Sequence, residues 1–176
     1  MTDPRPLVEE LVPAPDPLET CTRFAGLPFL VFLDSATDPE PLGRHSFLAA
    51  DPYTAVRSKG LLTQQLVAGT WLRVEGDPLA RVAALLAPHT AQPVGGGGGG
   101  DVPPFQGGAA GYIGYDWGML LERVPRPRYD DLAIPDVLLG LYDWVIAWDH
   151  PAGRAWVIST GVPETGAARE QRAARR

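Results

Sequence analysis

Cysteine is nearly absent from this sequence of 176 residues, in which Cys21 is the only one. A single thiol cannot form an intramolecular disulfide, and it cannot build a multi-cysteine zinc site. Asparagine is missing altogether, so the chain has no N-glycosylation sequon. The single cysteine fits a reducing compartment, and we expect a cytoplasmic protein.

Long apolar runs are missing as well. No stretch approaches the roughly 18 apolar residues of a membrane span, and residues 1–17 lack the pattern of a signal peptide. Lysine is reduced to Lys59, and the formal net charge is -6. Because nucleic-acid binding needs clustered basic residues, we expect neither nucleic acid nor a membrane as a partner.

The signatures of common catalytic sites are also missing. The chain has no GxSxG elbow, no HExxH pair and no GxxxxGK[ST] loop. Its histidines, His45, His89 and His150, lack the spacing of metal ligands. The run Gly95–Gly100 matches GxGxxG only trivially, because no strand and helix flank it directly. We therefore predict no catalytic residue, no metal ligand and no cofactor site in this chain.

Short strands and helices are what the sequence does contain. They predict an α/β (α+β) fold of antiparallel sheets with peripheral helices. Asp16-Pro17 and Asp77-Pro78 each place a capping side chain before a proline in the first helical turn, which predicts two helices. Apolar or alternating segments predict strands at 8–12, 29–33, 47–50, 55–58, 61–67, 70–74, 105–122, 137–148 and 154–160.

The last two of these segments predict a hairpin, since a five-residue turn with Pro and Gly separates them. Its aromatic residues occupy even positions, so we expect Tyr142, Trp144, Trp148 and Trp156 to share one face. We expect one domain over 1–162 with a flexible glycine loop at 92–102, because six glycines lose much backbone entropy on ordering. Residues 163–176 are expected to start a helix that leads into a further domain.

The stretch 28–52 organises the rest of the prediction. A buried strand ends at Asp34-Ser35, a turn with two prolines follows, and the chain returns into a second strand. We expect an offset strand pair whose polar corner brings Ser35, Arg44, His45 and Ser46 around one spot. Hydroxyl and charged groups in such a corner suit a small zwitterion.

Three separated blocks resemble one known family. They are LDSA with GRHSFLAADP (33–36 and 43–52), GGAAGYIGYDW (107–117) and DDLAIPDVLLGLYDWVIAWDH (130–150). In this order they are similar to the N-terminal domain of the large subunits of chorismate-utilising synthases. LDSA with SFLAADP is most similar to component I of aminodeoxychorismate synthase, with component I of anthranilate synthase the near sibling. The resemblance covers nearly all of 7–161 and implies the first part of that fold, truncated.

The resemblance implies half of a ligand pocket. In these families a serine that ends the LxS strand and the R-x-S segment after the turn bind tryptophan. The matching positions here are Ser35, Leu42, Gly43, Arg44, His45 and Ser46. The other half, a Pro-x-Tyr-Met-like segment, is not in this chain.

The resemblance also implies that the chemistry lies elsewhere. Family members bind chorismate and magnesium in their C-terminal region, which in the aminodeoxychorismate branch supplies a lysine within Pro-Ile-Lys-Gly-Thr. This chain lacks that motif, and Lys59 in SKG does not match it. The implied partners are the chorismate-binding domain and a glutamine amidotransferase subunit.

Two classes of function remain open at this point. The first is the N-terminal, non-catalytic part of a chorismate-amination synthase for 4-aminobenzoate and folate, with an anthranilate synthase fragment of tryptophan biosynthesis as its alternative. The second is a free-standing module that binds an aromatic amino acid. Serines that only satisfy turn amides are the plain structural interpretation of Ser35 and Ser46.

Overall fold

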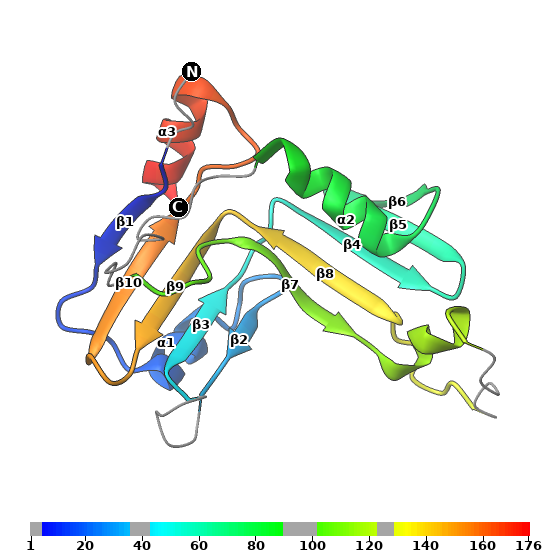
Figure 1. Ribbon diagram of the computed structural model, residues 1–176, viewed down its shortest axis with the longest axis horizontal. Helices are drawn as coiled ribbons and strands as arrows, with labels where there is room; N and C mark the ends of the chain where they lie inside the picture. Colours follow the sequence, from blue (N-terminus) through cyan, green and yellow to red (C-terminus); the bar gives the residue numbers. More distant parts are fainter. Residues whose placement is uncertain (1–4, 36–42, 90–101, 123–128) are drawn as a thin grey trace. The chain divides into compact units, whose positions relative to one another are not determined.

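The computed structural model describes residues 5–35, 43–89, 102–122 and 129–176 (Figure 1). They divide into two compact units: 1–53 with 89–108 and 142–176, and 54–88 with 109–141. Each unit has a five-stranded sheet, and the predicted class of antiparallel sheets with peripheral helices is confirmed. The predicted glycine loop falls almost wholly outside the described residues.

The sheet of the first unit has the order β1-β10-β9-β3-β2. Its strands are β1 (Leu7–Glu10), β2 (Val31–Leu33), β3 (His45–Ala49), β9 (Trp144–Asp149) and β10 (Arg154–Ser159). The sequence predicts β1 as an edge strand because Pro13 stops it, and this is confirmed. The strand predicted at 29–33 is shorter, since Phe29 has a left-handed φ of 52° and pairing starts only at Val31.

The sheet of the second unit has the order β6-β5-β4-β8-β7. Its strands are β4 (Thr54–Lys59), β5 (Leu62–Val67), β6 (Thr70–Val74), β7 (Gly108–Ile113) and β8 (Val137–Tyr142). The predicted meander of three strands is confirmed by the pairing of β4 with β5 and of β5 with β6. The strand predicted over 105–122 is wrong in its second half, where the 3-10 helix η2 (Tyr115–Leu120) follows β7.

Local capping signals account for two helix starts. In α1 (Pro17–Phe24), Asp16 Oδ1 accepts the backbone N–H of Glu19 at 2.8 Å. In α2 (Pro78–Leu86), Asp77 Oδ1 accepts two backbone N–H groups of the first turn, both at 2.9 Å. Both predicted helix starts are confirmed. They could be predicted from the sequence because a capping aspartate bonds to backbone N–H groups within three residues of itself. A short 3-10 helix, η1 (Ala87–His89), follows α2.

The sheet of the first unit carries one apolar cluster on each face. Leu48 and Trp148 pack with Phe24 of α1 on one face. Ala147 and Trp156 belong to the cluster on the other face. The prediction that Trp156 shares a face with Trp148 is therefore wrong, because the register pairs Trp156 with Ala147 and Trp148 with Ala155.

The apolar run 137–148, predicted as one strand, is two strands in two different sheets. Between β8 and β9 stands Asp143, whose side chain is fully buried. Its Oδ2 accepts from Nε of Arg172 at 2.6 Å and from Nε of Arg176 at 3.2 Å. Both arginines come from the C-terminal segment containing helix α3 (Gly166–Arg175), which begins slightly later than the predicted 163. A buried carboxylate needs such partners, and they attach the helix to the sheet.

Replacement of Gly111 tests the close approach of β7 to β8. Gly111 has φ +150°, and a Cβ there would lie 2.1 Å from the carbonyl oxygen of Leu138. We expect Gly111→Ala to lower the free energy of unfolding by at least about 2 kcal/mol in urea denaturation. Gly118→Ala is the matched control, because nothing lies within 4 Å of a Cβ at that position. Equal losses in both variants would contradict the close approach.

Replacement of Asp143 tests the attachment of α3. Asp143→Asn leaves Arg172 and Arg176 opposite a neutral group, so we expect the free energy of unfolding to fall by about 3 kcal/mol in urea at pH 7. Arg176 also binds Asp51, at 2.5 Å, but the Asp51 side chain is 45% exposed. Asp51→Asn should therefore cost less than about 1 kcal/mol. A loss as large as that of Asp143→Asn would argue against burial as the cause.

Candidate functional site

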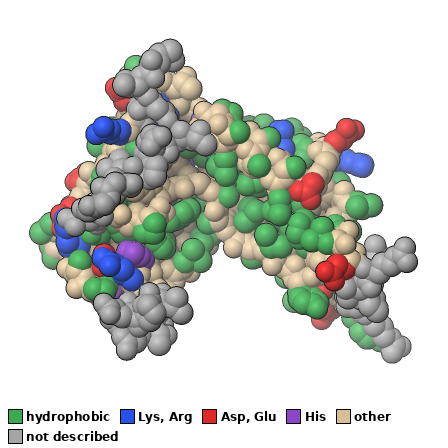
Figure 2. Space-filling model, viewed as in Figure 1, with side chains coloured by type: hydrophobic (Ala, Val, Ile, Leu, Met, Phe, Trp, Pro, Cys, Tyr) green, Lys and Arg blue, Asp and Glu red, His purple; other side chains and the backbone are tan. Residues whose placement is uncertain are grey.

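The polar corner lies at one end of the sheet of the first unit, where β2 ends and β3 begins. The predicted residues found there are Ser35, after β2; Gly43 and Arg44, before β3; and His45 and Ser46, the first residues of β3. Leu42 lies outside the described residues. Figure 2 shows histidine and basic side chains meeting near this end of β3 and β9.

One group of contacts centres on Ser46, which is fully buried. Its hydroxyl donates to Asp34 Oδ1 at 2.8 Å and accepts the backbone N–H of Ser35 at 3.0 Å. His150 Nε2 lies 2.8 Å from the same oxygen. The Ser35 hydroxyl donates to the carbonyl of His45 at 2.6 Å. We call Asp34, Ser35, Ser46 and His150 the Ser46 cluster.

A second group of contacts centres on Asp149, which is only 5% exposed. Arg44 donates to Asp149 Oδ2 from Nε at 3.1 Å and from Nη2 at 2.7 Å, while Oδ1 accepts the N–H of Ala152 at 3.2 Å. His45 Nε2 lies 3.8 Å from Oδ2. We call Arg44, His45 and Asp149 the Asp149 cluster.

The protonation of the Asp149 cluster follows from burial and charge. Burial by itself raises the pKa of Asp149, but the hydrogen bonds and charge of Arg44 outweigh it, and the net pKa lies below the ordinary value. Burial lowers the pKa of His45; the Asp149 carboxylate opposes this, while Arg44 and His150 add to it. The cluster is therefore an ion pair of Arg44 and Asp149 beside a neutral imidazole at pH 7.

The sequence predicts that Ser35, Arg44, His45 and Ser46 surround one spot, whereas the structure divides them between two clusters. Side chains alternate along a strand, so His45 and Ser46 point to opposite faces of β3. Ser35 and Ser46 come together in one cluster, and Arg44 and His45 in the other. Binding of a ligand by these residues stays a prediction.

Sequence reasoning missed three members of the corner, namely Asp34, Asp149 and His150. Asp34 stands beside Ser35 in LDSA, and the other two close the third resembling block. Two ionisable residues directly at and after the end of an apolar strand were a usable signal. The sequence could not show which residues Asp149 and His150 contact. Those contacts depend on the register of β3 on β9, in which His45 pairs with Asp149.

Lys59 in the second unit is held between two carboxylates. Its Nζ lies 2.6 Å from Asp130 Oδ2 and 3.0 Å from Asp136 Oδ1. The hydrogen bonds to Asp130 and Asp136 raise the pKa of Lys59, so the amine stays protonated. Asp136 also accepts the N–H of Gly60 at 2.7 Å. This lysine is a structural cation, and the geometry gives it no nucleophilic role.

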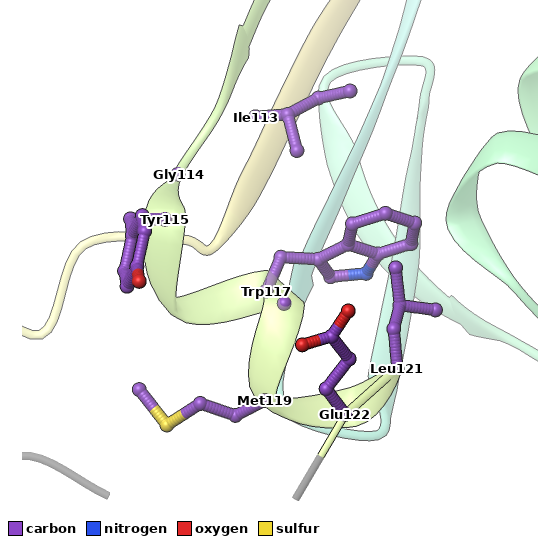
Figure 3. A pocket seen from close by; sticks show the side chains of 8 residues that line it. Ile113, Gly114, Tyr115, Trp117, Met119, Leu121 and Glu122 are labelled. Atoms are coloured by element: carbon purple, nitrogen blue, oxygen red, sulfur yellow. The ribbon is translucent and has the colours of Figure 1, made fainter. Parts of the chain in front are cut away.

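The second unit also has an open apolar pocket of about 320 Å³ beside η2. Figure 3 shows the indole of Trp117 between Ile113 and Leu121, with the carboxylate of Glu122 nearby. Hydrophobic side chains also gather on the surface of this unit in Figure 2. The lining of this pocket is mainly apolar, with Glu122 as its charged side chain. The polar corner, which carries charges of both signs, is the better candidate site for a zwitterion.

Known proteins resemble this chain along most of its length, although no protein-family model matches it. Aminodeoxychorismate synthase component 1 of Salmonella typhimurium is 36% identical over 127 residues, which are 70% of this chain and 26% of that protein. Anthranilate synthase component 1 of Pseudomonas putida is 30% identical over 171 residues, 95% of this chain and 34% of that protein. The chain is homologous to component 1 of the chorismate-utilising synthases. The resemblance found in the sequence is confirmed.

A solved synthase structure supports the fold. Anthranilate synthase component I from Streptococcus pneumoniae TIGR4 matches 79% of this chain and 29% of its own, with a TM-score of 0.57 and 24% identity. The chain therefore spans about a quarter to a third of the component 1 proteins that it matches. In the part of the chain that the structure describes, no helix is long and apolar enough to cross a membrane.

The Asp149 cluster makes the titration of His45 a direct test. We expect the pKa of His45 to lie below 6.5 in an NMR titration of its ring protons, because burial disfavours the imidazolium. Asp149→Asn should lower it further, since the carboxylate that favours the charged ring is lost. Asp131→Asn, at an exposed position of the second unit, should leave it unchanged. A rise in the pKa of His45 in Asp149→Asn would refute this arrangement.

Proposed function

We propose that the chain forms the N-terminal, non-catalytic region of a chorismate-amination synthase large subunit of the aminodeoxychorismate type. The observation that carries the proposal is the match of 70% of the chain to only 26% of the Salmonella protein. The remaining three quarters of that protein have room for the chemistry that this chain lacks. In such an enzyme the chain would work with a chorismate-binding region and a glutamine amidotransferase subunit.

The residues of the chain support a non-catalytic role. Its one lysine is Lys59, and two aspartates hold its amine protonated. Among the described residues no three His, Cys, Asp or Glu side chains come together as a metal site requires. The described residues therefore do not fit the magnesium ion that the family resemblance implies.

We further propose that the polar corner is half of a pocket for tryptophan. Arg44 presents a guanidinium whose side chain is 58% exposed, which suits a ligand carboxylate. Asp34 is an exposed carboxylate that suits an ammonium group. The hydroxyls of Ser35 and Ser46, by contrast, already have partners within the corner. The corner therefore offers charges to an amino acid but little apolar cover for an indole.

Anthranilate synthase component 1 is the second candidate. The observation in its favour is that the Pseudomonas putida protein matches 95% of the chain, a larger share than the Salmonella protein matches. Both candidates give the chain the same place in a large subunit. They differ in the product, which residues outside this chain would determine.

Calorimetric titration with L-tryptophan tests the half-pocket. We expect the chain alone to bind with a Kd weaker than about 1 mM, because charge pairs at an exposed corner contribute little without apolar burial. A chimera in which the chain replaces the matched region of the Salmonella protein should bind at least roughly tenfold more tightly. It should also make aminodeoxychorismate from chorismate and ammonia, whereas the chain alone should turn over no chorismate.

Two outcomes would contradict the proposal. Turnover of chorismate by the chain alone would show that it is catalytic. Micromolar binding of L-tryptophan by the chain alone would favour a free-standing amino-acid-binding module. Arg44→Gln in the chimera is the matched variant, because it removes the guanidinium charge and leaves a shorter side chain that is still polar. It should weaken tryptophan binding without abolishing turnover.

A further inference from the structure

Strand β9 ends at Asp149, His150 follows it in the turn, and both residues contact the start of β3. Asp149 pairs with His45 in the ladder, and the backbone N–H of His150 donates to the carbonyl of Arg44 at 2.9 Å. Asp149 binds Arg44, whereas His150 Nε2 lies 2.8 Å from the hydroxyl of Ser46. One residue of the pair therefore serves each cluster of the corner.

The hydrogen bonds of Ser46 fix the direction of its proton. A hydroxyl has one hydrogen and two lone pairs. The N–H of Ser35 donates to one lone pair, and the carboxylate of Asp34 takes the hydrogen. The second lone pair is left for His150, whose Nε2 lies 2.8 Å away and must carry a hydrogen. With His150 in place, every hydrogen-bonding position of the buried hydroxyl is used.

Asp149 fixes Arg44 in the same manner. Two nitrogens of the guanidinium converge on Oδ2, and Oδ1 is held by the N–H of Ala152. The carboxylate is almost wholly buried while the arginine side chain is 58% exposed. The inner edge of the guanidinium is therefore anchored and its outer part faces solvent, which is a preorganised arrangement for an anion.

We propose that Asp149 and His150 are the positioning residues of the corner: Asp149 sets the guanidinium of Arg44, and His150 sets the hydroxyl of Ser46 and, through it, the carboxylate of Asp34. Neither residue touches the ligand. The class of ligand, an amino acid with a free carboxylate and ammonium, rests on the proposed function. The positioning itself rests only on the contacts between β9, β3 and the end of β2.

NMR on the unmodified full chain tests the role of His150. Long-range proton–nitrogen correlations should show His150 with a hydrogen on Nε2 at neutral pH, and the amide of Ser35 should be protected from hydrogen exchange. His150→Ala should speed that exchange by roughly tenfold, since Ser46 loses a partner. His150→Gln, whose side-chain amide also donates, should restore most of the protection. A neutral His150 with its hydrogen on Nδ1 would overturn the proposal.

Tryptophan binding in the chimera tests the role of Asp149. Asp149→Asn should weaken L-tryptophan binding by at least roughly tenfold, because Arg44 loses its anchor. The matched control Asp51→Asn should leave the affinity for L-tryptophan unchanged. Unchanged affinity in Asp149→Asn would overturn the proposal for Asp149.

The two experiments separate this inference from the function on which it rests. If the NMR results are as expected and the unmodified chimera binds no tryptophan, the proposed pocket is wrong and the positioning by His150 stands. If the chimera binds tryptophan and His150 has the other tautomer, the pocket stands and the positioning by His150 is wrong.

Discussion

The pairing of β9 on both sides is the constraint on which the first unit depends. All six residues of the strand are buried, and it pairs with β10 along one edge and β3 along the other. An interior strand has no freedom to slip, because a shift by one residue would exchange the two apolar clusters. The positions of Asp143, before β9, and of Asp149, at its end, are therefore fixed by the sheet.

Both ends of this strand carry a buried carboxylate with arginine partners. Asp143 precedes the strand and binds the arginines of the C-terminal segment, while Asp149 closes it and binds Arg44. Burying a carboxylate is costly unless a cation is paired with it, so each aspartate determines where its arginines lie. One strand thereby attaches a helix at one end and organises a candidate ligand site at the other.

The ligand site that we propose for this chain has a physical rationale. The corner is built from the ends of strands, and its charges are ordered by the sheet and not by a substrate. An amino acid bound there would contribute free energy only through contacts with the corner and with whatever covers it. If this chain supplies one half of a pocket and the rest of a synthase supplies the other, ligand binding would depend on the contact between these two parts of the enzyme.

Local signals in the sequence determined a good part of this fold. Asp16 and Asp77 cap their helices through atoms within three residues, and the strands of the meander pair with their neighbours in the chain. The absence of catalytic motifs and the family resemblance were equally readable. The serines of the corner were found because they lie near each other in the sequence, at the end of β2 and the start of β3, and these two strands pair.

Tertiary structure decided the features that depend on pairing between distant segments. An apolar run gives no sign that Asp143 divides it between two sheets, because its partners Arg172 and Arg176 come about thirty residues later. The number of residues in the turn after β9 sets the face of Trp156, and the register of β3 on β9 brings Asp149 and His150 to the corner. Period and propensity describe each strand by itself, whereas register is a property of two strands together.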